Sequence, residues 1–497
     1  MSTPPRERMT GVDTAWLRMD RPTNPMVIVG VMMLGERLDY RRLRHALERG
    51  FLSFDRFRQR PVHDGATWYW ETDPNFDLER HVHRTALPAP AGKKELLEFV
   101  SDLASTSLDP QQPLWQFNLV ERYGEGSALV IRIHHCYADG MALVRVLLSM
   151  TEEGPKPRSR AARLAFWPPG VESWFPWMEP MTGAANRMLE WSTGFWQRYL
   201  EMLVQPGKAL EYAQLAAGSA SEAVKLLTMS PEPATRLRGK PGLSKRAAWC
   251  EPLPLAEVKQ AGKVLGCSIN DMLLASAAGA LRRYLVAHRE KVDTLEIRVV
   301  VPVNLRNGED ADGLGNKFGM VFLQLPVGIA NPLERLYTVR SRMQALKNSP
   351  QPMLVLGLLA ASGSGPAAMQ ELLLQTLSSH ATAVMTNVPG PQQRLHFAGA
   401  ELAQQIFWVP QSGDIAIGAS ILSYAGQVQF GLITDAKIVP DPEKIVDAFE
   451  PEFRQLQQVA EMHPWESPPE PAHVERLLAK ARHGKSPRRR ARAVKPS

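Results

Sequence analysis

Cysteine is scarce in this sequence: only Cys136, Cys250 and Cys267 occur in 497 residues. Their wide spacing fits neither a disulfide framework nor a cysteine-based zinc site. Free thiols are typical of proteins that are kept in a reducing compartment. We therefore expect a cytoplasmic protein without structural disulfides.

Long apolar runs are also lacking. The longest, at residues 352–361, is far shorter than the roughly 20 residues with which a helix crosses a bilayer. Residues 1–9 carry prolines and charges where a signal peptide would have an apolar core. We expect a soluble or peripheral protein, and 497 residues are enough for more than one domain.

Positive charge is not spread evenly along the sequence. The net charge is +7, but residues 471–497 alone carry nine Lys and Arg against one Glu, so the remainder is close to neutral. A nucleic-acid-binding domain is expected to spread basic and aromatic side chains over a folded face, so we expect no nucleic-acid partner. The basic end is either a solvated tail or a contact for anionic lipid headgroups.

Two segments of the sequence alternate between strand-like and helix-like patterns, which predicts an α/β fold. Between them lies a partly helical linker that holds five of the twelve tryptophans. This linker is either a brace between domains or a contact with a lipid surface, because tryptophan favours interfaces. We expect an N-terminal half, the linker, a C-terminal half and a basic tail at residues 1–150, 151–245, 246–462 and 463–497, with a site in the cleft between the halves.

The most distinctive stretch joins a predicted strand, residues 128–133, to a predicted helix, residues 141–150. The string between them is HHCYADG, residues 134–140. Side chains at such junctions are held by rigid elements and often carry out chemistry.

Three chemistries could use this string. A metal site would need more ligands, and the spacing of the other candidates does not supply them (His63, His81 and His83). A nucleophilic triad would need an activated Ser or Cys, and no G-x-S-x-G motif is present. General-base catalysis needs only an imidazole with a pKa near neutrality and a group such as Asp139 or a backbone carbonyl to hold the ring. The third chemistry therefore requires the least beyond the residues present.

The string HHCYADG resembles the HHxxxDG signature of the bacterial wax ester synthase/diacylglycerol acyltransferase family, within the superfamily of CoA-dependent acyltransferases. Other segments resemble further family motifs in the same order: DTAW (13–16), NPM (24–26), PLW (113–115), ND (270–271), PVNLR (302–306), GN (315–316) and NVPGP (387–391). Two features depart from the family pattern, namely Thr386, where serine is at least as common, and the basic tail.

The resemblance implies two chloramphenicol-acetyltransferase-like α/β domains with a tunnel between them. It implies that His135 is the general base and that no acyl-enzyme forms. Asp139 is implied to be structural, paired with an arginine that is either Arg298 or Arg306. His134 is expected to pack against or orient the motif, with a contact to substrate as the alternative.

Two further parts of the motifs have implied roles. Gly140 permits the backbone to come close beside the site. Asn270 is a candidate donor for the oxyanion of the reaction, although Asn270 and Asp271 could equally be only the start of a helix that Ser268 caps. We expect His135 to face Asn270 across the tunnel, within reach of solvent, because a ring sealed from solvent would count heavily against catalysis.

The implied activity is transfer of a long-chain acyl group from acyl-CoA to a fatty alcohol, diacylglycerol or both, as in wax ester and triacylglycerol biosynthesis. Acyl-CoA would be a co-substrate, with no bound cofactor or metal. Peripheral association with the inner face of the membrane or with lipid inclusions follows, because the substrates are apolar. The alternatives are an acyltransferase of the superfamily with another acceptor or a carrier-bound acyl group, and a non-catalytic lipid-binding protein.

Overall fold

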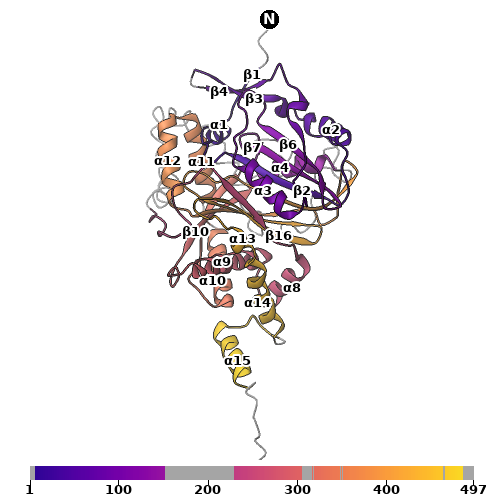
Figure 1. The fold of residues 1–497 in the computed structure, drawn as a ribbon. Helices are drawn as coiled ribbons and strands as arrows, with labels where there is room; N and C mark the ends of the chain where they lie inside the picture. Colours follow the sequence, from indigo (N-terminus) through magenta and orange to yellow (C-terminus); the bar gives the residue numbers. More distant parts are fainter. Residues whose placement is uncertain are drawn as a thin grey trace, which may run out of the picture.

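The computed structural model describes residues 6–65, 67–151, 229–304, 316, 318–347, 349, 351–462 and 465–484. Most of the tryptophan-rich linker, Arg306 and the end of the basic tail therefore lie outside the described residues. The described parts form two α/β halves, one above the other in Figure 1.

The strand that leads into the histidine motif is central in a six-stranded sheet. β7 (Gly126–His134) pairs with β2 (Val27–Leu34) on one side and β6 (Trp115–Tyr123) on the other. Every residue of β2 and β7 is buried, as expected for short apolar runs without polar alternation. The sheet order is β13-β14-β2-β7-β6-β5, which adds β5 (Val82–Thr85), β13 (His396–Phe397) and β14 (Ala400–Trp408).

Helices and a small sheet surround this half. A three-stranded sheet has the order β1-β4-β3, with bounds Arg6–Arg8, Thr67–Thr72 and Gln59–Asp64 respectively. The helices are α1 (Gly11–Arg18), α2 (Tyr40–Arg49), α3 (Lys93–Ala104) and α4 (Gly140–Ser149). α4 begins directly after the motif, so the predicted strand-to-helix junction is confirmed.

The second half is built on a seven-stranded sheet of order β11-β10-β12-β15-β16-β8, with β9 also paired to β16. Its strands are β8 (Lys245–Trp249), β9 (Leu253–Pro254), β10 (Ile297–Asn304), β11 (Phe318–Leu325), β12 (Ala383–Pro389), β15 (Ile417–Tyr424) and β16 (Gln427–Asp435). Its helices are α8 (Leu255–Leu265), α9 (Ile269–Ala287), α10 (Pro332–Lys347), α11 (Gln351–Ser364), α12 (Ala367–Ser379), α13 (Glu443–Val446), α14 (Phe449–Glu461) and α15 (Pro471–Gly484).

The helices of the second half form two groups. α8, α9, α10 and α14 lie together below the sheet in Figure 1, while α11 and α12 lie beside α1 of the first half. α15 projects away from the body toward the end of the chain. The α/β fold class expected from the sequence is confirmed.

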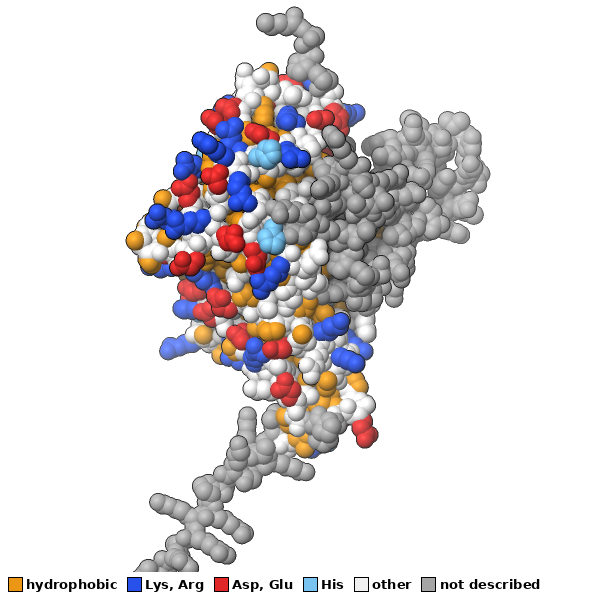
Figure 2. Space-filling view, turned by 90° about the vertical axis from the view of Figure 1, so that its right-hand side faces the viewer, with side chains coloured by type: hydrophobic (Ala, Val, Ile, Leu, Met, Phe, Trp, Pro, Cys, Tyr) orange, Lys and Arg blue, Asp and Glu red, His pale blue; other side chains and the backbone are white. Residues whose placement is uncertain are grey.

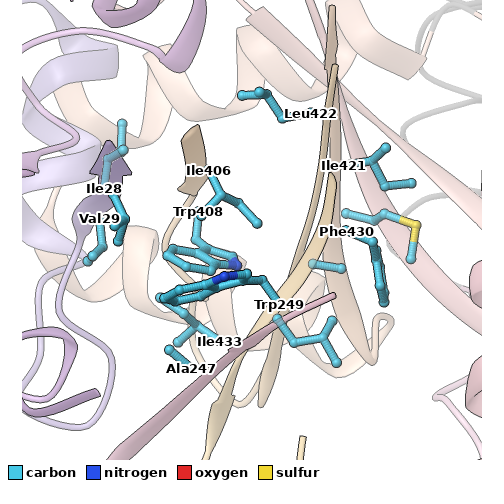
Figure 3. Packing of buried hydrophobic residues seen from close by; sticks show 14 of the residues in the cluster. Ile28, Val29, Ala247, Trp249, Ile406, Trp408, Ile421, Leu422, Phe430 and Ile433 are labelled. Carbon is cyan, nitrogen blue, oxygen red and sulfur yellow. The ribbon is translucent and has the colours of Figure 1, made fainter. Parts of the chain in front are cut away.

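Two strands from the C-terminal segment of the sequence, β13 and β14, belong to the sheet of the first half. β14 was assigned to the C-terminal half by its position in the chain, but it pairs with β2 of the first sheet, with Trp408 opposite Val29. Ile406 and Trp408 lie between the two sheets in Figure 3, and the Trp408 ring lies 5.9 Å from that of Trp249 on β8. This crossover joins the halves through a shared apolar core.

The longest described helix has the predicted start. The Ser268 hydroxyl accepts from the Asp271 amide at 3.2 Å, and the Asp271 carboxylate accepts from the Ser268 amide at 2.9 Å. This reciprocal capping box satisfies two of the amide groups that a helix start leaves unpaired. The first residues of α9, including Asn270, are therefore held firmly.

The surface of the molecule carries charges of both signs. In Figure 2, acidic and basic side chains are interspersed over the described part of the face, in keeping with the nearly neutral body. Among the residues with a described structure, no single helix has the length and apolar composition of a membrane span; only α8 and α9 taken together do, and they are bent by 98° at their junction.

Candidate active site

The backbone of His135 is fixed by the strands on both sides of β7. The His135 amide donates to the Met26 carbonyl at 2.7 Å, and the His134 amide donates to the Leu114 carbonyl at 2.9 Å. Met26 precedes β2 and Leu114 precedes β6. The motif therefore leaves the sheet at a defined point between its two neighbours.

The ring of His135 is enclosed by aromatic side chains from both halves. It stacks on Trp16 of α1, with centroids 4.0 Å apart and planes at 20°, and it lies 5.6 Å from Phe318 of β11. His135 is only 3% exposed, so the expectation that solvent reaches its ring is wrong for this structure.

Burial also sets the protonation of this ring. It lowers the pKa of His135 from 6.5 to about 4, against smaller opposing effects from the Asp139 charge, the carbonyl of His135 and the Asn316 side chain. The imidazole is therefore neutral at pH 7 and able to accept a proton, but its pKa lies well below the near-neutral value expected from the sequence for a general base.

A polar bridge between the halves reaches the backbone of His135. The Asn316 amide nitrogen donates at 2.9 Å to the Asp13 carboxylate on α1 and at 2.9 Å to the His135 carbonyl. Burial raises the pKa of Asp13, while the hydrogen bond from Asn316 lowers it. In the sequence, Asp13 and Asn316 stand only within the DTAW and GN motifs, and no pattern predicted a role for either of them.

Polar atoms without partners gather around the same ring. Among the described residues, His135 Nδ1, Trp16 Nε1 and Asn316 Oδ1 are buried and make no hydrogen bond of normal geometry. Such atoms are rare in folded proteins and are costly unless a ligand satisfies them. A polar group of a bound molecule would satisfy these three atoms.

His134 has a different environment from its neighbour. Its Nδ1 accepts from the Cys136 amide at 3.2 Å, and its Nε2 lies 3.7 Å from the Asp20 carboxylate. Asp20 also accepts from the Met26 amide at 2.6 Å. These contacts suit the supporting role expected for His134.

Asp139 is the N-cap of α4. Its carboxylate accepts from the Ala142 amide at 2.9 Å. Arg298 is not its partner, because that guanidinium lies 3.4 Å from Glu232 and donates to the carbonyls of Ser230 and His380. The other candidate, Arg306, lies outside the described residues.

The space next to Gly140 is open. Among the described residues, a Cβ atom built at this position would meet no heavy atom within 4 Å, and the backbone is not in the left-handed region. Neither protein packing nor conformation therefore requires glycine at this position. No described segment of the protein makes the close approach to the Gly140 backbone that was expected.

Asn270 lies in the first turn of α9, and its side-chain oxygen accepts from the Asn387 amide nitrogen at 2.8 Å. Within the described structure its own amide nitrogen donates to no acceptor, so a donor remains available. Asp271 is engaged in the capping box. In the sequence Asn387 stands only within the NVPGP motif, and no pattern predicted its contact with Asn270. No hydrogen bond joins Asn270 to His135.

Two other chemistries find little support in the described residues. Burial raises the pKa of the Cys136 thiol well above its usual value, so this cysteine is not a thiolate nucleophile. His81 is buried and binds the Trp115 carbonyl at 2.9 Å. Across the described ranges, no three His, Cys, Asp or Glu side chains come together as a metal site would require.

Comparison with known proteins gives a consistent result. Residues 9–273 match the family model of the wax ester synthase/diacylglycerol acyltransferase catalytic domain, and residues 314–457 match the WS/DGAT C-terminal domain. A probable diacylglycerol O-acyltransferase of Mycobacterium tuberculosis is 30% identical over 400 residues, which cover 80% of this chain and 82% of that protein. A second, putative one from the same species is 26% identical over 483 residues, 92% of this chain and 91% of that protein.

Solved structures share the fold. The wax ester synthase/diacylglycerol acyltransferase from Marinobacter aquaeolei VT8 superposes with a TM-score of 0.64 at 22% identity, covering 92% of this chain and all of that chain. The condensation domain of the Monacolin K polyketide synthase MokA superposes with a TM-score of 0.57 at 13% identity, covering 93% and 99%.

Proposed function

The chain belongs to the wax ester synthase/diacylglycerol acyltransferase family and is an acyltransferase, and we propose that it transfers a long-chain acyl group from acyl-CoA to a hydroxyl group of diacylglycerol or a fatty alcohol. The observation that carries this proposal is the neutral ring of His135 at the junction of the halves, surrounded by buried polar atoms without partners. A substrate hydroxyl and a thioester carbonyl are groups that would satisfy them.

In the proposed mechanism His135 is the general base. Its Nδ1, which makes no hydrogen bond among the described residues, would carry the proton of the neutral ring, and Nε2 would accept the proton of the acceptor hydroxyl. The hydroxyl oxygen forms a bond to the thioester carbonyl carbon, and the carbon–sulfur bond then breaks. CoA leaves as a thiolate and takes the proton from His135. No acyl-enzyme is needed, in keeping with the buried, protonated Cys136.

Other residues are proposed to act around this step. The unpaired amide nitrogen of Asn270, with its side chain fixed by Asn387, would donate to the carbonyl oxygen as it becomes negatively charged. Asp139 and His134 would hold the motif in place rather than touch substrate. The open space at Gly140 would let substrate pass close to the backbone.

Substrate must displace part of the enclosure around His135. Trp16 and Phe318 come from different halves and both face the ring. We propose that the entering acyl chain separates these two side chains. Burial of long chains supplies the driving force, at about 0.8 kcal/mol for each CH₂ group removed from water.

The protein is also proposed to work at a membrane or lipid-inclusion surface on the cytoplasmic side, because its substrates are insoluble in water. Exposed apolar side chains support this, notably Leu372 on α12, which is 66% exposed. A basic chain end would add attraction to anionic headgroups.

One experiment separates this function from its rivals. Purified protein receives a long-chain acyl-CoA with equal amounts of hexadecanol and diacylglycerol, and both free thiol and ester products are followed. Thiol release matched by wax ester, triacylglycerol or both supports the proposal, and their ratio gives the preferred acceptor. Lipid binding without thiol release would indicate a non-catalytic binding protein.

A further inference from the structure

An indole N–H group beside His135 has no hydrogen-bond acceptor. Trp16 is only 5% exposed, and among the described residues its buried Nε1 makes no hydrogen bond. An indole nitrogen can donate a hydrogen bond but cannot accept one, and a buried donor without an acceptor is costly. An acceptor atom of a bound substrate would remove this cost.

The helix that carries Trp16 is held in place before any substrate binds. The Ala15 carbonyl of α1 accepts from the side-chain amide of Gln370 on α12 at 2.8 Å. The Arg18 guanidinium, at the end of α1, donates to the Gly365 carbonyl just after α11 at 2.9 Å. These contacts come one residue before Trp16 and two residues after it. The indole therefore needs little rearrangement to donate a hydrogen bond, and fixed donors of this kind are the effective ones in catalysis.

The stacking of Trp16 on His135 limits which substrate atom the indole N–H group can meet. The two ring planes are nearly parallel, at 20°, with centroids 4.0 Å apart. A hydroxyl group that gives its proton to His135 Nε2 lies near the plane of the imidazole, whereas the indole N–H bond points along the plane of the other ring. The hydroxyl oxygen is therefore poorly aligned to accept from Trp16.

The thioester carbonyl oxygen is better placed to accept this hydrogen bond. A hydroxyl oxygen attacks a carbonyl carbon from above the plane of the carbonyl group. A thioester that lies in the layer of the indole is thus open to attack from the layer of the imidazole. In that position its carbonyl oxygen can lie in the indole plane, in line with the N–H bond.

We propose that Trp16 is a catalytic hydrogen-bond donor, whose Nε1–H group binds the thioester carbonyl oxygen and stabilises the negative charge that forms on it. As the acceptor oxygen bonds to the carbonyl carbon, an electron pair moves onto the carbonyl oxygen. That pair re-forms the carbonyl double bond when the CoA thiolate leaves. The inference rests on the proposed function and deepens it, because it adds a donor from the first half for the oxygen that Asn270 would bind from the second. Entering substrate would displace Phe318 and leave Trp16 stacked on His135.

Replacement of the carbonyl oxygen by sulfur tests this contact, because sulfur is a weak acceptor. Wild type and Trp16→Phe are assayed with a long-chain acyl-CoA and with the matching dithioester, which has C=S in place of C=O. We expect Trp16→Phe to lower kcat by about tenfold to a hundredfold with the thioester but by less than about threefold with the dithioester.

Trp408→Phe is the matched control. Among the described residues, Trp408 Nε1 is also buried without a partner, but this ring lies between the two sheets near Trp249, as Figure 3 shows. The Trp408→Phe protein should lose no more rate with the thioester than with the dithioester. A selective loss with the thioester in this control as well would overturn the assignment to Trp16.

A second variant separates the N–H group from the bulk of the ring. Trp16→benzothienylalanine keeps both rings and has sulfur in place of the indole N–H group, and it should show the same selective loss as Trp16→Phe. Equal losses with thioester and dithioester, a loss in the Phe variant alone, or no loss in either variant would overturn the proposal, because Trp16 would then act only by packing on His135. If wild-type protein itself forms no ester from the thioester, the proposed function fails, and the role of Trp16 fails with it.

Discussion

The burial of His135 makes the stability of the protein depend on pH in a way that one substitution can isolate. Folding lowers the pKa of this ring from 6.5 to about 4, which corresponds to about 3 kcal/mol at about 1.4 kcal/mol for each pH unit. As the pH falls below 6.5, the His135 imidazole of the unfolded chain binds a proton, while the buried ring of the folded protein stays neutral. The resulting loss in the free energy of unfolding is absent above pH 6.5, grows between pH 6.5 and 4, and reaches its full size below about pH 4.

The assay compares wild type with His135→Gln by urea unfolding at several pH values from 7.5 to 4. The free energy of unfolding of wild type should fall by up to about 3 kcal/mol more than that of the variant over this range. His45→Gln is the matched control, because His45 is exposed on α2, and it should follow the wild-type curve. Parallel curves for wild type and His135→Gln would refute the inference that this ring is buried in its neutral form.

Three further substitutions test the roles proposed around the ring. Asn316→Ala removes the hydrogen bonds to Asp13 and to the His135 carbonyl. We expect kcat to fall by about tenfold to a hundredfold with KM nearly unchanged, which corresponds to a loss of about 1–3 kcal/mol of transition-state stabilisation. A rise in KM alone would contradict a positioning role. Asn270→Ala should lower kcat by about 100-fold or more if its amide stabilises the oxyanion, and steady-state kinetics with unchanged kcat would leave Asn270 only as the start of α9. Asp139→Ala should lower the free energy of unfolding by about 1 kcal/mol through loss of the helix cap. Asp139→Ser keeps a capping oxygen and should retain most of that stability. Equal losses in both variants would show that the cap does not cause the loss of stability.

Local features of the site were predictable from the sequence because they depend on neighbouring residues. The apolar run at residues 128–133 lies within β7, and the polar turn that follows it leads into α4. Ser268 and Asp271 are three residues apart, the spacing of a capping box, and they cap α9. In both cases the residues that determine the local structure are close neighbours in the sequence.

Features that depend on distant residues were not predictable in this way. Strand propensity identified β14 but could not tell which sheet it joins, since both sheets offer apolar neighbours. Asp13 and Asn316 are separated by 303 positions, and no local pattern indicates that they meet at the His135 carbonyl. The enclosure of His135 by Trp16 and Phe318 likewise follows from how the two halves pack.

The central claim is that His135 takes the proton from the acceptor hydroxyl. The most direct test measures thiol release and ester formation from long-chain acyl-CoA and acceptor with wild type and His135→Ala, alongside acyl-CoA binding by both proteins. We predict that the variant still folds and binds acyl-CoA but loses about 100-fold to 10,000-fold in kcat. A His135→Ala protein that forms ester at the wild-type rate would contradict it.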